Sequence, residues 1–262
     1  MKKVISVLLS FLILLITSSC GSETKKSTKK EKTKKNRIES IIVNSFDSQQ
    51  IFKFKYNNDH SVNVEIASKQ ASFSIHIDYN EDRKVTEMIS GAGRIQNIYG
   101  PEGRRVGSIV ISENSQVEFE YDQSGNLIRQ LNLAGNDTLA KYTYKYENGE
   151  DPQAVIFKDE DGNKRIYTLK FDTEENLVRN KFEMLYPQED IYWLGIPALY
   201  GKHNLLEATL ISKEEGKNAE VHLGTYSPGN IKYRFIKNDD GSFLIKSLSD
   251  GTREWTAQIK YE

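Results

Sequence analysis

The stretch Phe119-Glu-Tyr-Asp-Gln-Ser-Gly-Asn-Leu-Ile-Arg129 decides the fold. Val117, Phe119 and Tyr121 alternate with acidic residues, which is the period-two pattern of a strand with one buried face. The polar residues that follow, up to Asn126, include types that tolerate positive φ and can reverse the chain. The stretch therefore predicts a strand, a tight turn and the start of a returning strand.

The same unit recurs along much of the chain. Apolar and polar residues alternate in six further segments, namely 52–56, 73–79, 142–146, 167–171, 231–235 and 255–261. An aromatic residue precedes a polar turn at Tyr56, Tyr79, Tyr121, Tyr146 and Phe171, with a weaker copy at Tyr99. The spacing of about 20–25 residues corresponds to one hairpin, and such repetition is typical of a meander or stack. We expect the rings to lie at one level of the sheet and to stack between neighbouring hairpins.

These residues also carry a family resemblance. Tyr121-Asp122-x-x-Gly125-Asn126-Leu127 resembles a YD repeat of the Rhs type, and Phe171-Asp172-Thr-Glu-Glu-Asn176-Leu177 is a copy without the glycine. The layout of residues 37–262 resembles uncharacterised exported lipoproteins of Bacteroidetes with YD-like repeats. It includes Arg37-Ile38-Glu39-Ser40-Ile41 before the first unit and Gly201-Lys202-His203-Asn204-Leu205 opening a late strand. The resemblance implies an all-β antiparallel meander and no activity.

We therefore predict one all-β domain over residues 38–262. Its repeated hairpins form an antiparallel meander, as a curved sheet, a half-open barrel or a solenoid-like stack. A two-lobed version split near Met184 is the main alternative. Residues 184–203 break the alternation with two glycines and a proline after the Tyr186-Pro187 pair, which predicts one short helical turn and an ordered loop.

The aromatic residues of this insertion are candidate binding residues. In one interpretation they plug an open end or the concave face of the sheet. In the other, Tyr186, Tyr192, Trp193 and Tyr200 expose their rings as a platform for a glycan or a partner protein, because long loops on repetitive scaffolds often carry function.

The first residues predict export and a lipid anchor. Residues 1–19 form a signal peptide with a basic start and an apolar run, 4–16, that is too short to span a bilayer. Thr17-Ser-Ser-Cys20 resembles the lipobox of bacterial lipoproteins, in which cleavage precedes a lipidated Cys. The alternative is an ordinary secretory signal, but this would leave the lone thiol of Cys20 without a use. We therefore expect an outer-membrane lipoprotein, facing the periplasm or the cell surface.

Residues 20–37 are predicted to be a disordered, Lys-rich tether. Its lysines either keep the spacer soluble or contact anionic head groups. The first 37 residues hold ten of the 36 Lys and Arg and two of the 37 Asp and Glu, which leaves 26 against 35 and a net charge of −9 for the remainder. An acidic body argues against nucleic acid as a partner.

No linear motif for catalysis, a metal or a cofactor stands out. The four His residues lie at no metal-binding spacing, and the carboxylates near Gly162 and Gly241 fit hairpin turns better than calcium loops. Asp137-Thr138-Leu139 resembles an O-glycosylation site of exported Bacteroidetes proteins, which makes Thr138 a candidate. We predict no cofactor and a non-catalytic module that binds a glycan or an envelope protein. The alternatives are a glycan hydrolase with paired carboxylates and a structural subunit of an outer-membrane assembly.

Overall fold

The computed structural model describes residues 37–45, 48–69, 71–91, 93–147, 149–176, 201–216, 230–249 and 255–262. Every regular element in these ranges is a β-strand. The strands are β1 (Ile38–Asn44), β2 (Gln49–Tyr56), β3 (Ser61–Ser68), β4 (Ser72–Tyr79), β5 (Val85–Ser90), β6 (Gly93–Tyr99), β7 (Arg105–Val110), β8 (Ser115–Tyr121), β9 (Leu127–Ala134), β10 (Asp137–Lys145), β11 (Ala154–Asp159), β12 (Lys164–Glu175), β13 (His203–Glu214), β14 (Asn230–Lys237), β15 (Phe243–Ser249) and β16 (Trp255–Tyr261).

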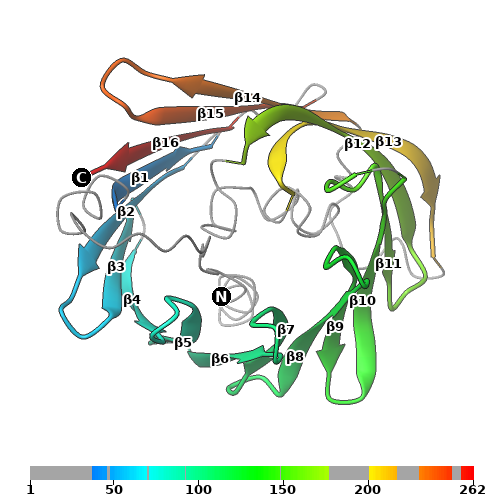
Figure 1. The fold of residues 1–262 in the computed structure, drawn as a ribbon, viewed down its shortest axis with the longest axis horizontal. Coiled ribbons are helices and arrows are strands. Elements are labelled where there is room, and N and C mark those ends of the chain that lie inside the picture. Colours follow the sequence, from blue (N-terminus) through cyan, green and yellow to red (C-terminus); the bar gives the residue numbers. More distant parts are fainter. Residues whose placement is uncertain are drawn as a thin grey trace.

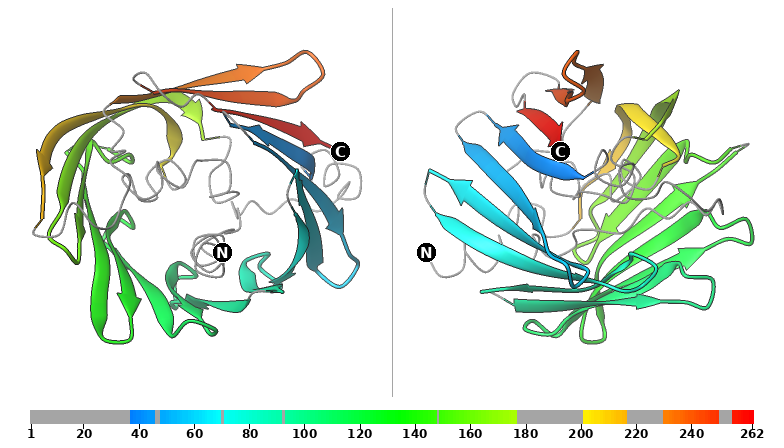
Figure 2. Two further views of the ribbon diagram at one scale, coloured as in Figure 1. Left: turned by 180° about the vertical axis from the view of Figure 1, so that it is seen from behind. Right: turned by 60° about the vertical axis from the view of Figure 1, so that its left-hand side comes forward.

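Each strand pairs antiparallel with its neighbours in sequence, as the meander prediction requires (Figure 1). Five of the six alternating segments identified in the sequence lie entirely on these strands, and the sixth, 142–146, extends one residue past β10. Figure 2 shows the strands tilted across the ring, as closure of a sheet demands. The all-β antiparallel meander is thus confirmed.

Of the predicted forms of the meander, the half-open barrel and the solenoid-like stack were wrong. β1 pairs with β16 from Ile38↔Tyr261 to Asn44↔Thr256, so the meander closes into a barrel of 16 strands. A half-open barrel or a solenoid would leave two strand edges unpaired, whereas closure satisfies both. The two-lobed alternative is also wrong, because β12 and β13 pair across the position of the proposed split. The predicted helical turn near 184–203 lies almost entirely outside the described residues.

The barrel wall has an apolar side and a polar side. In β3, Val62, Val64 and Ile66 are buried, while Glu65 between them is exposed. Because the sheet closes on itself, the shielded side is the one that faces the barrel axis. Full burial of such a side chain is worth about 1.5–3 kcal/mol, so burial of this inner face stabilises the wall.

Candidate functional site

The quoted stretch forms a five-residue turn between β8 and β9. The Asp122 N–H donates to the Asn126 carbonyl at 2.9 Å, and the Gly125 N–H donates to the Asp122 carbonyl at 3.0 Å. Gly125 has φ +86°, a left-handed conformation that favours glycine. This is a type I turn followed by a left-handed residue, the usual geometry of a three-residue hairpin loop.

The Asp and Asn of the motif form a second layer of contacts in this turn. One carboxylate oxygen of Asp122 accepts the Asn126 backbone N–H at 2.8 Å, and the other accepts the Asn126 amide at 3.0 Å. We call this two-bond contact the Asp–Asn clamp. The hydrogen bond from the Asn126 backbone lowers the pKa of Asp122, because it stabilises the charged carboxylate. Asp159 and Asn163 form the same clamp at the other end of the barrel, at 2.8 and 2.7 Å.

The repeated tyrosines join neighbouring turns at one end of the barrel. The hydroxyl donates to the carbonyl of the residue that begins the preceding strand, from Tyr99 to Val85 at 2.8 Å and from Tyr121 to Arg105 at 2.8 Å. Tyr146 does the same to Leu127, at 3.0 Å. We call this end, where Tyr56, Tyr79, Tyr99, Tyr121, Tyr146 and Tyr261 lie, the tyrosine rim.

At two of these tyrosines a basic side chain also lies over the aromatic ring. Arg104 lies over the ring of Tyr121 at 5.9 Å and Lys84 over that of Tyr99 at 5.7 Å, and in each case the cation immediately precedes the residue that accepts the hydroxyl bond. Burial raises the pKa of Tyr99 to about 12. The sequence placed the rings correctly at one level, but it did not anticipate that hydroxyl bonds and cations would join them across hairpins.

One turn of the tyrosine rim is interrupted. Asp172, at the position of Asp122, accepts the Asn204 backbone N–H at 3.1 Å and the Asn204 amide at 3.0 Å. These partners are 32 positions apart in sequence, whereas Asp122 and Asn126 are 4 apart. The predicted copy from Phe171 to Leu177 was therefore wrong in its second half, because the clamp partner of Asp172 is Asn204, on the far side of the β12–β13 connection.

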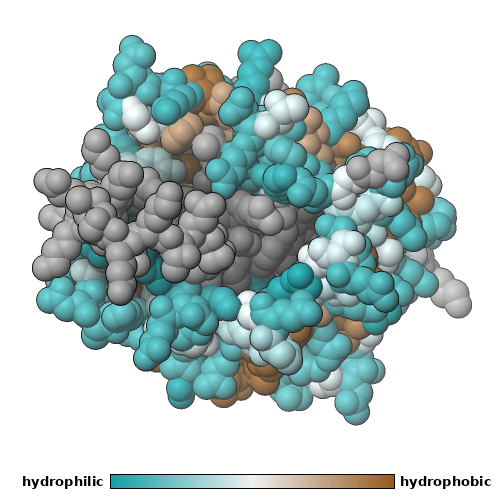
Figure 3. All heavy atoms as spheres, in the orientation of Figure 1, coloured by the Kyte–Doolittle hydropathy of each residue, from teal (hydrophilic) through white to brown (hydrophobic). Residues whose placement is uncertain are grey.

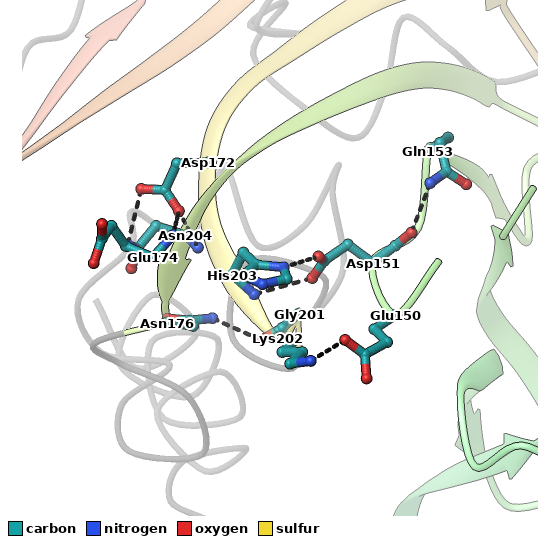
Figure 4. A network of polar contacts seen from close by, with 10 residues as sticks. All are labelled: Glu150, Asp151, Gln153, Asp172, Glu174, Asn176, Gly201, Lys202, His203 and Asn204. Carbon is teal, nitrogen blue, oxygen red and sulfur yellow. Dashed lines mark hydrogen bonds and ion pairs between the residues drawn. The ribbon is translucent and has the colours of Figure 1, made fainter. Parts of the chain in front are cut away.

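Next to this clamp, a polar network holds the connection to the β10–β11 loop (Figure 4). Asp151 is 9% exposed and accepts both the backbone N–H of His203, at 3.1 Å, and its ring Nδ1, at 2.5 Å. Lys202 pairs with Glu150. The Asn176 amide donates to the Gly201 carbonyl at 3.1 Å, which brings the two described ends of the connection together.

The His203–Asp151 pair is the most chemically distinctive contact of the rim. A buried carboxylate that faces Nδ1 fixes the orientation of the imidazole, as in sites where the other ring nitrogen handles a proton. The same contact also clamps two loops together without any chemistry. Among the described residues, no group of three or more His, Cys, Asp and Glu side chains could hold a metal ion.

The residues named from the sequence are placed only in part. Thr138 is exposed on β10, opposite Leu133 of β9. Cys20, Tyr186, Tyr192, Trp193 and Tyr200 lie outside the described residues. Sequence reasoning missed the network of Asp151, Asp172, His203 and Asn204. The available signal was that Phe171-Asp172 and Asn204-Leu205 are the two halves of one YD motif.

The surface seen in Figure 3 is largely hydrophilic, with separate hydrophobic patches. Several exposed charges form pairs that cross adjacent strands. Arg129 of β9 pairs with Glu120 of β8 at 2.5 Å, and Lys170 of β12 pairs with Glu207 of β13 at 3.2 Å. Exposed pairs of this kind contribute little stability. The outer side of the wall also exposes apolar side chains, among them Ile98 of β6 and Ile109 of β7, so it is mixed in character.

Hairpins joined by YD-type turns and closed into a ring define the class of this protein as a YD-repeat β-barrel. The family model described as teneurin YD-shell matches residues 15–199, more than half of the 262 residues. The chain belongs to this family. No curated protein matches it.

Among solved structures, the chain is similar to a porin-like protein from Bacteroides uniformis. The TM-score is 0.53 at 12% identity, over 86% of this chain and 98% of that one. At this identity the likeness concerns the fold alone. In the described ranges no helix has the length and apolar character needed to cross a bilayer.

Proposed function

We propose that this chain is a membrane-anchored envelope lipoprotein whose barrel is a non-catalytic module that binds a glycan or a protein. The observation that carries the binding role is the interrupted turn. A rim built from short repeated turns opens at Asp172 into a long connection and closes again at Asn204. Long departures from a repetitive scaffold are where binding residues concentrate.

The polarity of the wall supports an anchor outside the barrel. Lys53, Glu65 and Lys141 are exposed on the outer side, each between two more buried neighbours on its strand. A transmembrane barrel has the opposite arrangement, with an apolar outer band, and an Arg or Lys at the bilayer midplane costs about 2–4 kcal/mol. Exposed apolar residues such as Ile98 and Ile109 lie on other strands, but the exposed charges on β2, β3 and β10 interrupt any continuous apolar band. We therefore assign membrane retention to a lipid on Cys20.

The sequence of the β12–β13 connection supports a glycan or a protein as the ligand. Tyr186, Tyr192, Trp193 and Tyr200 all fall within it. Aromatic rings bind sugar faces and also anchor protein interfaces, because they bury a large area at low entropic cost. A soluble glycan and an envelope protein are therefore the two ligand classes to test.

Two experiments test this proposal. In fractionated cells, the native chain should stay with the membrane in high salt, whereas Cys20→Ser should be released; retention of both would refute the lipid anchor.

A glycan array and a pull-down from solubilised envelope should each be run with the native chain and with Trp193→Ala. Trp255→Ala, a change in the buried wall, is the control for lost stability. Loss of ligand by folded Trp193→Ala is the expected result, and unchanged binding would refute the aromatic platform.

A further inference from the structure

We infer that residues 173–203 are an insertion into a turn of the YD repeat, and that the barrel forms without them. The first support is the Asp–Asn clamp itself. The two hydrogen bonds from Asn204 to Asp172, at 3.1 and 3.0 Å, match those from Asn126 to Asp122, at 2.8 and 3.0 Å. Three residues, 123–125, separate the partners of the intact clamp, whereas 31 residues, 173–203, stand in the same place here.

The strand register agrees with that of the intact turn. Tyr121 pairs with Leu127 and Glu120 with Arg129, so the register shifts by one residue between these pairs. On the other hairpin Phe171 pairs with Leu205 and Lys170 with Glu207, which is the same shift at the same place. A bulge is a specific feature of a hairpin, and finding it on both sides of a long connection indicates that the original turn geometry is retained.

Side chains at these positions repeat as well. Glu120 and Arg129 form an ion pair across β8 and β9, and Lys170 and Glu207 form one across β12 and β13 with the signs exchanged. Leu127 and Leu205, which follow the two Asn residues, are both buried. Around the clamp the β12–β13 hairpin therefore matches a repeat unit, although its ladder shifts register again between Ile166 and Tyr167 and continues past the clamp to Glu175↔His203.

The two ends of the insertion meet at one point. The Asn176 N–H donates to the Lys202 carbonyl at 2.9 Å, and the Asn176 amide donates to the Gly201 carbonyl. Closing a longer loop costs entropy that grows only slowly with length, so a barrel can carry an insertion at such a place. By the same reasoning, removing the part of the insertion beyond its stem should not destabilise the wall, whereas removing the stem as well also takes away the His203 partner of Asp151.

The test is excision in the otherwise complete chain. One variant replaces residues 173–203 by Gln-Ser-Gly, which recreates the turn at 122–126, and a second replaces only 177–200 by Gly-Ser-Gly-Ser and keeps the stem. Circular dichroism should show the same strand signal, and at least one variant should melt cooperatively at a midpoint equal to or above that of the full chain. If neither variant folds, the inference is overturned.

A double-mutant cycle tests the clamp without any deletion. Asp172→Ala and Asn204→Ala, alone and together, are compared with Asp122→Ala and Asn126→Ala by the shift in melting midpoint. We expect the two cycles to show non-additivity of the same sign and similar size. Additive shifts at 172 and 204, beside clear coupling at 122 and 126, would overturn the equivalence of the two turns.

The functional consequence rests on the binding role proposed above. The first excision variant, once folded, should fail to capture the glycan or envelope protein that the full chain binds. A folded variant that still binds would refute the location of the proposed binding site and leave the insertion itself supported. An unfolded pair of variants refutes the insertion and says nothing against the binding role, so the two failures are distinguishable.

Discussion

Replacing Gly125 by Ala, with Gly241→Ala as its matched control, tests how the tyrosine rim is held together. Both glycines occupy the fourth position of a five-residue turn, with φ of +86° and +81°. An alanine in the left-handed region costs about 1–2 kcal/mol at either site. The gain from restricting the unfolded chain is also common to both, so it cancels in the comparison.

The two sites differ in what a new Cβ would meet. At Gly241 nothing lies within 4 Å, whereas at Gly125 the Cβ would collide with the guanidinium of Arg104. Arg104 would have to leave the ring of Tyr121, over which it lies at 5.9 Å. A cation over an aromatic ring at an exposed site is worth about 0.5–1 kcal/mol, so Gly125→Ala should cost that much more than Gly241→Ala.

Urea unfolding followed by circular dichroism measures both free energies. A second control makes both glycine substitutions in an Arg104→Ala background. The collision is absent there, so the two substitutions should lower the free energy of unfolding by the same amount. Equal costs in the native background, or a difference that survives Arg104→Ala, would show that the cation does not stabilise the rim.

Three further predictions concern the rim. Tyr121→Phe removes the hydroxyl that donates to the Arg105 carbonyl, so the free energy of unfolding should fall by about 1 kcal/mol in urea melts; no change would mean that water replaces the bond. Because the pKa of Asp122 is lowered in the folded barrel, its contribution to stability is present above the unfolded pKa of about 3.9 and is lost as the pH falls through the folded pKa. Melting midpoints between pH 6 and pH 2 should therefore fall less for Asp122→Asn than for the native chain, and equal slopes would contradict this. Because burial raises the pKa of Tyr99 to about 12, stability should fall as the pH rises from about 10 towards 12; ultraviolet difference titration should show fewer phenolates at pH 11 in the folded chain than in urea, and equal counts would argue against burial.

The strands and turns could be predicted because their signals are local. Alternation over five to seven residues decides a strand, and Gly125 sits where the chain needs positive φ. Closure into a barrel could not be predicted in this way. It depends on whether the edges of β1 and β16, at opposite ends of the chain, find a common register, and no local pattern encodes that pairing.

The interrupted turn was missed for a related reason. Asp172 has a nearby asparagine, Asn176, at the spacing that the motif demands, and a local reading accepts it. In the structure Asn176 instead donates to the Gly201 carbonyl, and the clamp goes to Asn204. Strand pairing decides between the two asparagines, because only Asn204 lies at the start of β13, the strand that continues the barrel.

The geometry of the repeat also explains why its sequence motif is degenerate. The turn bonds join backbone groups, and the tyrosine hydroxyls at 99, 121 and 146 bind backbone carbonyls, so most partners place no demand on a side chain. Even the left-handed position is not restricted to glycine, since His60 and Arg83 occupy it with φ of 65° and 60°. The YD motif is therefore one of several sequences that form this turn. The turn beginning at Asn238 closes with the same backbone bonds and has no Tyr-Asp pair, so a count of YD motifs underestimates the number of such turns in this chain.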